Sequence, residues 1–567
     1  MPPSSNFNKS CLALAIAQTL THGVAQAATV TVDSLDAPFA DSTECDLTDA
    51  LVTVNRGSNS DTGCSVDTSN GSLGVNDTIV FDPSVANSLH FIDTSIIKSV
   101  SINPNGPRID IVSYIIGAPV FFISNAEVSL NNLKISSGFS ENFNGGGISI
   151  INSTVNIDNS EITSNMAPSG GGISAVDSIV NINDSVITRN TSSFGDGGGI
   201  DATNSKVSLN NSVVSDNYAS FRGGGIQLFG EGGYLNLSNS TVSNNTAERG
   251  SGGGVGVVFS NFSAQSSTFA DNSSGLGGAG IDISESQVNL NDIKVSSNSG
   301  NGLSVGGVSS SVEVSNSEIS DNSGLSAGGV SVASRGQMSV SNTTVSGNSS
   351  STDGGGFRVV SGAHLTLNSV TISGNSADKR GGGIEAITGG IVDLINSTVS
   401  GNSASSGGGI QVGAYSSYVP VGRVNLSNTT LSDNSADRGG GILLNYDGEA
   451  SFSNSIVANS TGGDCVNDSS VPVTASPANI IADGGCNTGA LSIDPLLRPL
   501  ANNGGPTQTH ALVASSPAIN AGIGLGATES DQRGVPALGI RDLGAFEYRL
   551  TIAPIVDLLL QDEDEIE

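Results

Sequence analysis

Histidine, a side chain often used in acid–base catalysis and metal binding, is rare in this sequence. Past residue 27, histidine occurs only at His90, His364 and His510, and none of them lies near a second histidine or an acidic stretch along the chain. Cleavage of a polysaccharide needs closely placed carboxylates, or a basic residue beside an acidic cluster that binds calcium. No charged cluster has the spacing of such a site, so we expect no catalytic residue, no metal and no cofactor.

Three arginines are candidates for a binding role. Arg222, Arg380 and Arg438 each stand directly before a triplet of glycines. Repeated at one position of a regular fold, they could form a basic stripe for an acidic glycan. Acidic neighbours such as Asp378 and Asp437 favour ion pairs within each turn instead, and exposed pairs of this kind stabilise a fold only weakly.

Two tyrosines are the remaining ligand-binding candidates. Tyr415 and Tyr418 lie on an apparent insertion in the longest repeat unit. Exposed aromatic side chains can stack on sugars or anchor a partner. The alternative is a loop that folds back onto the neighbouring strands.

An internal repeat predicts the elements that position these residues. Clusters of glycine followed by Ile, Val or Phe recur through residues 145–442, and each unit has an asparagine three positions after an aliphatic residue. The asparagines are spaced by about 27 residues on average, which is typical of a solenoid. They are Asn165, Asn190, Asn217, Asn245, Asn272, Asn298, Asn322, Asn348, Asn375, Asn402, Asn434 and Asn459.

One repeat unit, residues 197–222, shows the expected secondary structure. Its apolar residues fall in short segments that alternate with polar ones, which predicts strands. Three short strands per unit match one turn of a parallel β-helix, so the predicted fold class is all-β. Coils stacked about 4.8 Å apart would align the asparagines in a ladder, each amide donating to one neighbouring coil and accepting from the other. Glycosylation at Asn-x-Ser/Thr is the alternative, but the fixed spacing favours the ladder.

The first 27 residues have the pattern of a signal peptide. Lys9 precedes an apolar stretch over residues 11–20, and Ala25 and Ala27 form an A-x-A cleavage site, so we expect export and a secreted or cell-surface protein. The apolar stretch is interrupted by polar residues, and we expect no transmembrane span. The formal net charge of −32 makes nucleic acid an unlikely partner because polyphosphate would be repelled.

Four cysteines remain after the expected cleavage. They form two local pairs near the ends of the chain, and in an oxidising compartment they predict the disulfides Cys45–Cys64 and Cys465–Cys486. Neither pair has the ligand spacing of a zinc site or a nearby histidine.

Both flanks of the repeats resemble known families of secreted proteins. Residues 45–51 and 76–83 resemble the CSLREA-type N-terminal region, and the glycine and asparagine repeats are similar to those of polymorphic outer membrane proteins. The C-terminal motifs resemble the choice-of-anchor Q region; they are DPLL at 494–497, NGGPTQTHAL at 503–512, SPAINAG at 516–522, DQRGVP at 531–536 and DLGAFEY at 542–548. The resemblance implies a right-handed parallel β-helix of the pectin-lyase-like superfamily and does not imply a reaction. We expect caps at both ends because the end coils of a solenoid expose unpaired strand edges. The sequence motifs of pectinases are absent.

The expected organisation is a signal peptide (1–27), an N-terminal cap (28–110), β-helix repeats (111–460), a C-terminal cap with the anchor-like region (461–548) and an acidic tail (549–567). We expect a non-catalytic surface or matrix protein that adheres to a glycan or to a host or cell-surface protein. A polysaccharide lyase or hydrolase is the alternative.

Overall fold

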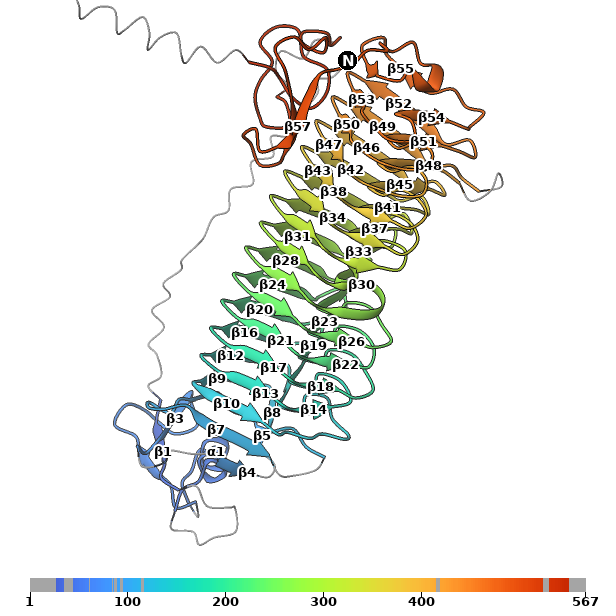
Figure 1. The fold of residues 1–567 in the computed structure, drawn as a ribbon. Coiled ribbons are helices and arrows are strands. Elements are labelled where there is room, and N and C mark those ends of the chain that lie inside the picture. Colours follow the sequence, from blue (N-terminus) through green and yellow to red (C-terminus); the bar gives the residue numbers. More distant parts are fainter. Residues whose placement is uncertain are drawn as a thin grey trace, which may run out of the picture.

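The computed structural model describes residues 27–34, 44–60, 62–83, 85, 89–91, 95–113, 117–414, 419–523 and 530–549. Nearly all of the described secondary structure consists of short strands that wind into a long parallel β-helix (Figure 1). The predicted signal peptide and acidic tail, apart from their residues 27 and 549, lie outside the described residues.

One coil shows how the repeat folds. It contains β19 (Ile200–Thr203), β20 (Lys206–Asn210), β21 (Val213–Ser215) and β22 (Tyr218–Ala219). Along β20 the side chains alternate between exposed and buried, as expected for a strand with one face in the core. The turn between β20 and β21 places Asn211 at φ +49°, a left-handed conformation that asparagine tolerates better than most residues.

Equivalent strands of successive coils form three parallel sheets. The first sheet includes β20, the second includes β21, and the third includes β19 and β22. The second sheet positions the site described below. Its strands are β4 (Leu89–Phe91), β7 (Ile109–Ser113), β10 (Leu133–Ser136), β13 (Glu161–Thr163), β17 (Val186–Thr188), β21, β25 (Thr241–Ser243), β29 (Thr268–Ala270), β32 (Lys294–Ser296), β35 (Glu318–Ser320), β39 (Thr344–Ser346), β43 (Thr371–Ser373), β47 (Thr398–Ser400), β50 (Thr430–Ser432), β53 (Ile456–Ala458) and β56 (Ile480–Ile481).

The core runs the length of the solenoid because each strand contributes the same inward position in every coil. In the second sheet, Val242, Phe269, Val295 and Ile319 are aligned in register and fully buried. Burying a side chain of this size contributes about 1.5–3 kcal/mol to stability. Stability is therefore distributed along the stack, and each coil depends on its neighbours.

The asparagine ladder lies at the turn that follows the second sheet. From Asn165 to Asn434, the Nδ2 of each asparagine donates to the Oδ1 of the asparagine in the next coil, at 2.8–3.1 Å. The second Nδ2 hydrogen is donated to a main-chain carbonyl, as from Asn348 to Ile319 at 2.9 Å. A buried turn thus keeps its polar groups paired.

The prediction for Asn459 is wrong. Its side chain is exposed, and its Nδ2 donates to Ser432 Oγ at 3.3 Å rather than to the ladder. Strand β53 pairs Val457 with Leu431, so the residue in register with Asn434 is Ser460. The sequence pattern placed Asn459 three residues after Ile456, whereas the residue of this strand in register with Leu431 is Val457.

The two ends carry caps that differ from the coils. Helix α1 (Leu47–Arg56) lies beside β1 (Thr29–Val32), β4 and β5 (Ser95–Ile96) at the N-terminal end (Figure 1). It begins after Asp46, whose side chain accepts from Asp49 N, and ends at Gly57 in a left-handed conformation. Both predicted disulfides are present, Cys45–Cys64 in this cap and Cys465–Cys486 at the other end.

Candidate functional site

The chain after the last coil turns back and packs along the side of the β-helix. Residues 494–523 and 530–548, here called the C-terminal module, include the antiparallel strands β57 (Leu497–Ala501) and β58 (Thr509–Leu512). Figure 1 shows the module beside the last coils of the solenoid. It covers the outer face of β43, β47 and β50 through hydrogen bonds to Thr371, Thr398 and Thr430. It also bonds the carbonyl of Asn454 in the turn before β53 and packs against Ile456 of that strand.

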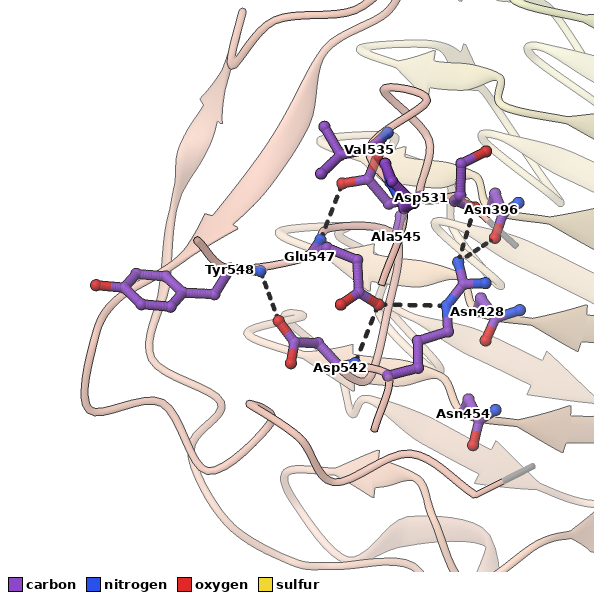
Figure 2. A network of polar contacts seen from close by, with 12 residues as sticks. Asn396, Asn428, Asn454, Asp531, Val535, Asp542, Ala545, Glu547 and Tyr548 are labelled. Carbon is purple, nitrogen blue, oxygen red and sulfur yellow. Dashed lines mark hydrogen bonds and ion pairs between the residues drawn. The ribbon is translucent and has the colours of Figure 1, made fainter. Parts of the chain in front are cut away.

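Acidic residues hold the module together (Figure 2). Glu547 N donates to Asp531 Oδ2 at 2.9 Å, and Tyr548 N donates to Asp542 Oδ2 at 2.5 Å. Arg541 Nη2 donates to Asn396 Oδ1 of the solenoid at 2.6 Å, and its Nε lies 3.4 Å from Glu547 Oε1. Burial, followed by repulsion from Asp542, raises the pKa of Glu547 to about 7. These acids therefore organise the loops of the module, and Arg541 links them to the solenoid.

His510 belongs to the same attachment. It is 1% exposed, with Nε2 at 2.9 Å from Ser400 Oγ and Nδ1 at 2.8 Å from the carbonyl oxygen of Arg498. Burial lowers its pKa, which favours the neutral imidazole. A neutral ring can donate from Nδ1 to the carbonyl oxygen and accept at Nε2 from the serine hydroxyl.

A groove of about 760 Å³ begins where the module ends. It follows the outer face of the second sheet across β29, β32, β35, β39 and β43, and Pro506 and Gln508 of the module line its end. We call it the lateral groove. Its lining residues are Ser266, Ser267, Thr268, Asp292, Ile293, Lys294, Asn316, Ser317, Glu318, Thr344, Ser346, Ser373, Pro506 and Gln508.

Strand alternation explains why this lining is polar. Phe269, Val295 and Ile319 point into the core, so the residues before them, Thr268, Lys294 and Glu318, point outward. Lys294 Nζ lies 3.4 Å from Glu318 Oε1, and both side chains are about half exposed, at 51% and 47%.

The charge of the groove is slightly negative. Asp292 Oδ2 accepts a hydrogen bond from Ser266 Oγ at 2.7 Å at the turn that borders the groove. With Asp292, Glu318 and Lys294 charged, the lining has a formal charge of −1. The groove therefore offers hydroxyl, amide and charged groups to a polar ligand and does not favour a strongly anionic one.

The arginines predicted to bind a ligand lie elsewhere. Arg380 makes a bidentate contact with Asp353, at 2.9 Å for both bonds, and its Nε lies 3.5 Å from Glu385 Oε1. Arg438 Nε donates to Asp468 Oδ2 at 2.7 Å. Arg222 N donates to Asp196 Oδ1 at 2.8 Å, and none of the three arginines lines the lateral groove.

The prediction that these arginines form ion pairs within single turns is wrong for two of them. Arg380 and Arg438 pair with acids of a neighbouring coil, 27 and 30 residues away, rather than with Asp378 and Asp437. Parallel coils stack about 4.8 Å apart, so a residue one period away lies as close as one in the same turn. Tyr415 and Tyr418 lie outside the described residues.

Carboxyl groups with strongly raised pKa values are found away from the groove. Burial raises the pKa of Asp201 on β19 to about 7, with a further contribution from Asp196. Burial and repulsion from Asp353 raise the pKa of Glu385 to about 7 against the opposing effect of Arg358 and Arg380. Glu385 is fully buried, which separates it from any ligand in solvent.

The structure contains one close acid–base pair that was not predicted from the sequence. His364 Nε2 lies 2.7 Å from Asp393 Oδ2 on the outer face of the first sheet, with both side chains partly exposed. The two residues are 29 positions apart, so a search one coil away would have found them. Among the described residues, no group of three or more His, Cys, Asp or Glu side chains is arranged to hold a metal ion.

Comparison with known proteins gives a match over part of the chain. The family model described as "Right handed beta helix region" matches residues 260–423, which include every groove residue on the strands. No curated protein matches the chain. Among solved structures, the crystal structure of pectate lyase Pel9A is similar at 14% identity, covering 77% of this chain and 89% of that chain, with a TM-score of 0.29. Within the part of the chain that the structure describes, no helix is long and apolar enough to cross a membrane.

Proposed function

We propose that this protein is an extracellular right-handed β-helix that binds a glycan in the lateral groove without cleaving it, and so serves adhesion or the organisation of an extracellular matrix. The observation that carries the proposal is the groove itself. It is an open, polar trough of about 760 Å³ along five strands, bounded at one end by Pro506 and Gln508.

The lining suits a hydroxyl-rich polymer better than a globular partner. Serine, threonine and asparagine side chains line both the sheet and the adjoining turn, and they can both donate and accept hydrogen bonds. The groove lies on a rigid sheet, so little ordering is required when a ligand binds. Its formal charge of −1 favours a neutral glycan over the acidic glycan considered for the arginines.

The positions of the titratable groups favour binding over cleavage. A general acid works best with a pKa near the working pH. Asp201, Glu385 and Glu547, each with a pKa raised to about 7, lie outside the groove lining. The lining carboxylates of Asp292 and Glu318 contact Ser266 and Lys294, respectively.

Export is supported by the signal-like sequence of residues 1–27 and by the two disulfides. Disulfides persist in oxidising compartments and are rare in the cytosol. An extracellular location would give the groove access to surface and matrix polysaccharides.

A glycan array with the exported protein tests the proposal, and Ser346→Trp tests the groove. Ser346 is a partly exposed lining residue on β39, and a tryptophan there would fill the trough. Ser215→Trp is the matched control, because Ser215 occupies the same register position on β21, outside the lining. We expect binding that Ser346→Trp abolishes and Ser215→Trp retains.

No binding to any glycan, or equal binding by both variants, would overturn the proposal. A panel of polysaccharides with and without Ca²⁺ measures cleavage in parallel. Product release that Ser346→Trp abolishes would establish the alternative, a polysaccharide lyase or hydrolase.

A further inference from the structure

The two ends of the lateral groove differ. Past the end at β43, the next strand of the second sheet is β47, and both of its outward residues, Thr398 and Ser400, are buried under the C-terminal module. Past the other end, at β29, the outward residues Thr241 and Ser243 of β25 are partly exposed. The module therefore closes the groove at one end, whereas the other end continues onto an open sheet face.

The segment that closes the groove, residues 506–508, is here called the end wall, and it is fixed to the solenoid. Thr507 Oγ1 donates to the carbonyl of Ser369 at 3.1 Å, and Thr371 Oγ1 donates to the carbonyl of Gln508 at 2.6 Å. Gln532 Nε2 donates to Thr507 Oγ1 at 2.9 Å and to the carbonyl of Gln508 at 3.1 Å. A ligand cannot displace the end wall without breaking these hydrogen bonds.

A polymer that follows the groove runs directly into the end wall. Register pairing aligns the outward residues from Thr268 on β29 to Thr344 on β39, and the next position is Thr371, whose hydroxyl is bonded to Gln508. Strands of stacked coils are about 4.8 Å apart, so the four steps from β29 to β43 give the groove a length of about 19 Å. An extended chain that fills the groove must therefore end at the end wall.

The end wall presents groups that can bind the last unit of a glycan. Gln508 is exposed, and its carboxamide makes no hydrogen bond to another described residue, so it can donate to a ligand and accept from it. Pro506 is also exposed, and its ring is rigid. An internal sugar unit is linked to a neighbour on each side, whereas a terminal unit carries a free hydroxyl in place of one linkage. Gln508 can bond this hydroxyl, which an internal unit does not have.

We infer that the lateral groove receives the end of a glycan chain rather than an internal segment, with the terminal sugar unit against Pro506 and Gln508. The inference rests on the proposed function and specifies which part of the glycan is bound.

Isothermal titration of the exported protein with intact and fragmented polymers tests this mode of binding. Pullulan, dextran, a linear β-1,3-glucan and a β-1,4-xylan are neutral polymers, and each is used intact and after partial hydrolysis to fragments that still fill the groove. Hydrolysis to about one tenth of the chain length raises the number of chain ends per gram about tenfold, so we expect about tenfold tighter binding per gram of the polymer that binds.

Two variants locate the bound end. Gln508→Ala removes the free carboxamide from the end wall, so we expect about tenfold weaker binding of the fragments. Gln337→Ala makes the same change at an exposed position of β38 (Gln337–Ser341), on the outer face of the first sheet, and should bind the fragments as the wild type does. Thermal unfolding of both variants establishes that the fold is retained.

The outcomes separate the two proposals. Equal affinity per gram for intact and fragmented polymer would overturn the recognition of chain ends and leave glycan binding in place. A preference for fragments that Gln508→Ala leaves unchanged would also overturn the inference, because the end would then be bound elsewhere. Failure to bind any of the polymers, intact or fragmented, would overturn both proposals.

Discussion

Replacing Asn348 with leucine removes one rung from the middle of the asparagine ladder. The side chain of Asn348 makes four hydrogen bonds: Nδ2 donates to Asn375 Oδ1 and to the carbonyl of Ile319, both at 2.9 Å, and Oδ1 accepts from Asn322 N at 3.0 Å and Nδ2 at 2.9 Å. Asn348 is fully buried, so water does not replace these contacts.

The expected cost follows from the groups that lose their partners. Leucine leaves the main-chain N–H of Asn322, one hydrogen of its amide and the carbonyl of Ile319 without the contacts they now make. Asn375 Oδ1 still accepts from the main-chain N–H of residue 348. An unsatisfied buried polar group costs about 1–3 kcal/mol, so three such groups should reduce the free energy of unfolding by about 3 kcal/mol or more.

Equilibrium denaturation in urea, followed by circular dichroism, measures this loss. Asn289→Leu is the matched control: it makes the same change on an exposed position of β31 (Gln287–Asn291), where we expect an effect within about 0.5 kcal/mol. Hydrogen exchange should show lost protection centred on the coils around residue 348. A difference between the two variants below about 1 kcal/mol would refute the idea that the ladder keeps buried groups paired.

Three further predictions concern other parts of the fold. Gly199→Ala should destabilise the protein by about 1–3 kcal/mol in the same denaturation assay, because a Cβ there would lie 2.7 Å from a carbonyl oxygen of the next coil. Gly306→Ala is the control and should be close to neutral, because no atom lies within 4 Å of a Cβ at that position. Asp201→Asn should raise the melting temperature at about pH 8 and change it little near pH 4. The folded pKa of Asp201 is about 7, above the ordinary 3.8, so burying the charged carboxylate reduces stability progressively as the pH rises between those values. An equal change in melting temperature at both pH values would contradict this reasoning. Reduction of Cys45–Cys64 and Cys465–Cys486 should increase hydrogen exchange near both caps before the central coils, because coils contact only their neighbours; simultaneous loss of protection everywhere would argue against it.

Much of the fold could be predicted from the sequence because the interactions that build it repeat locally. Alternating residues such as Val207 and Leu209 predict strands, and the spacing of about 27 residues predicts coils that stack. The ladder from Asn165 to Asn434 follows from the same periodicity, since residues in the same phase of a solenoid become neighbours. Asn459 departs because Ser460 occupies the position in register with Asn434, which the strand pairing reveals and the apolar pattern does not.

The ion pairs between coils could also be predicted from the repeat spacing. Arg380 and Asp353 are 27 residues apart, and His364 and Asp393 are 29 apart, so each pair spans one coil. Charges one period apart in the sequence become neighbours in a solenoid, so both pairs follow from the repeat and not from the charges within a single turn.

The candidate site depends on contacts that no repeat predicts. The sequence identified the C-terminal motifs but gave no reason for Gln532 to contact Thr371 and Thr398, which precede it by 161 and 134 residues. Only the tertiary structure places the module on four strands of the second sheet, and so decides where the exposed face begins and the lateral groove opens. The sequence determined the repeating solenoid through local periodicity, while the groove arose from one non-repeating segment that packs against its side.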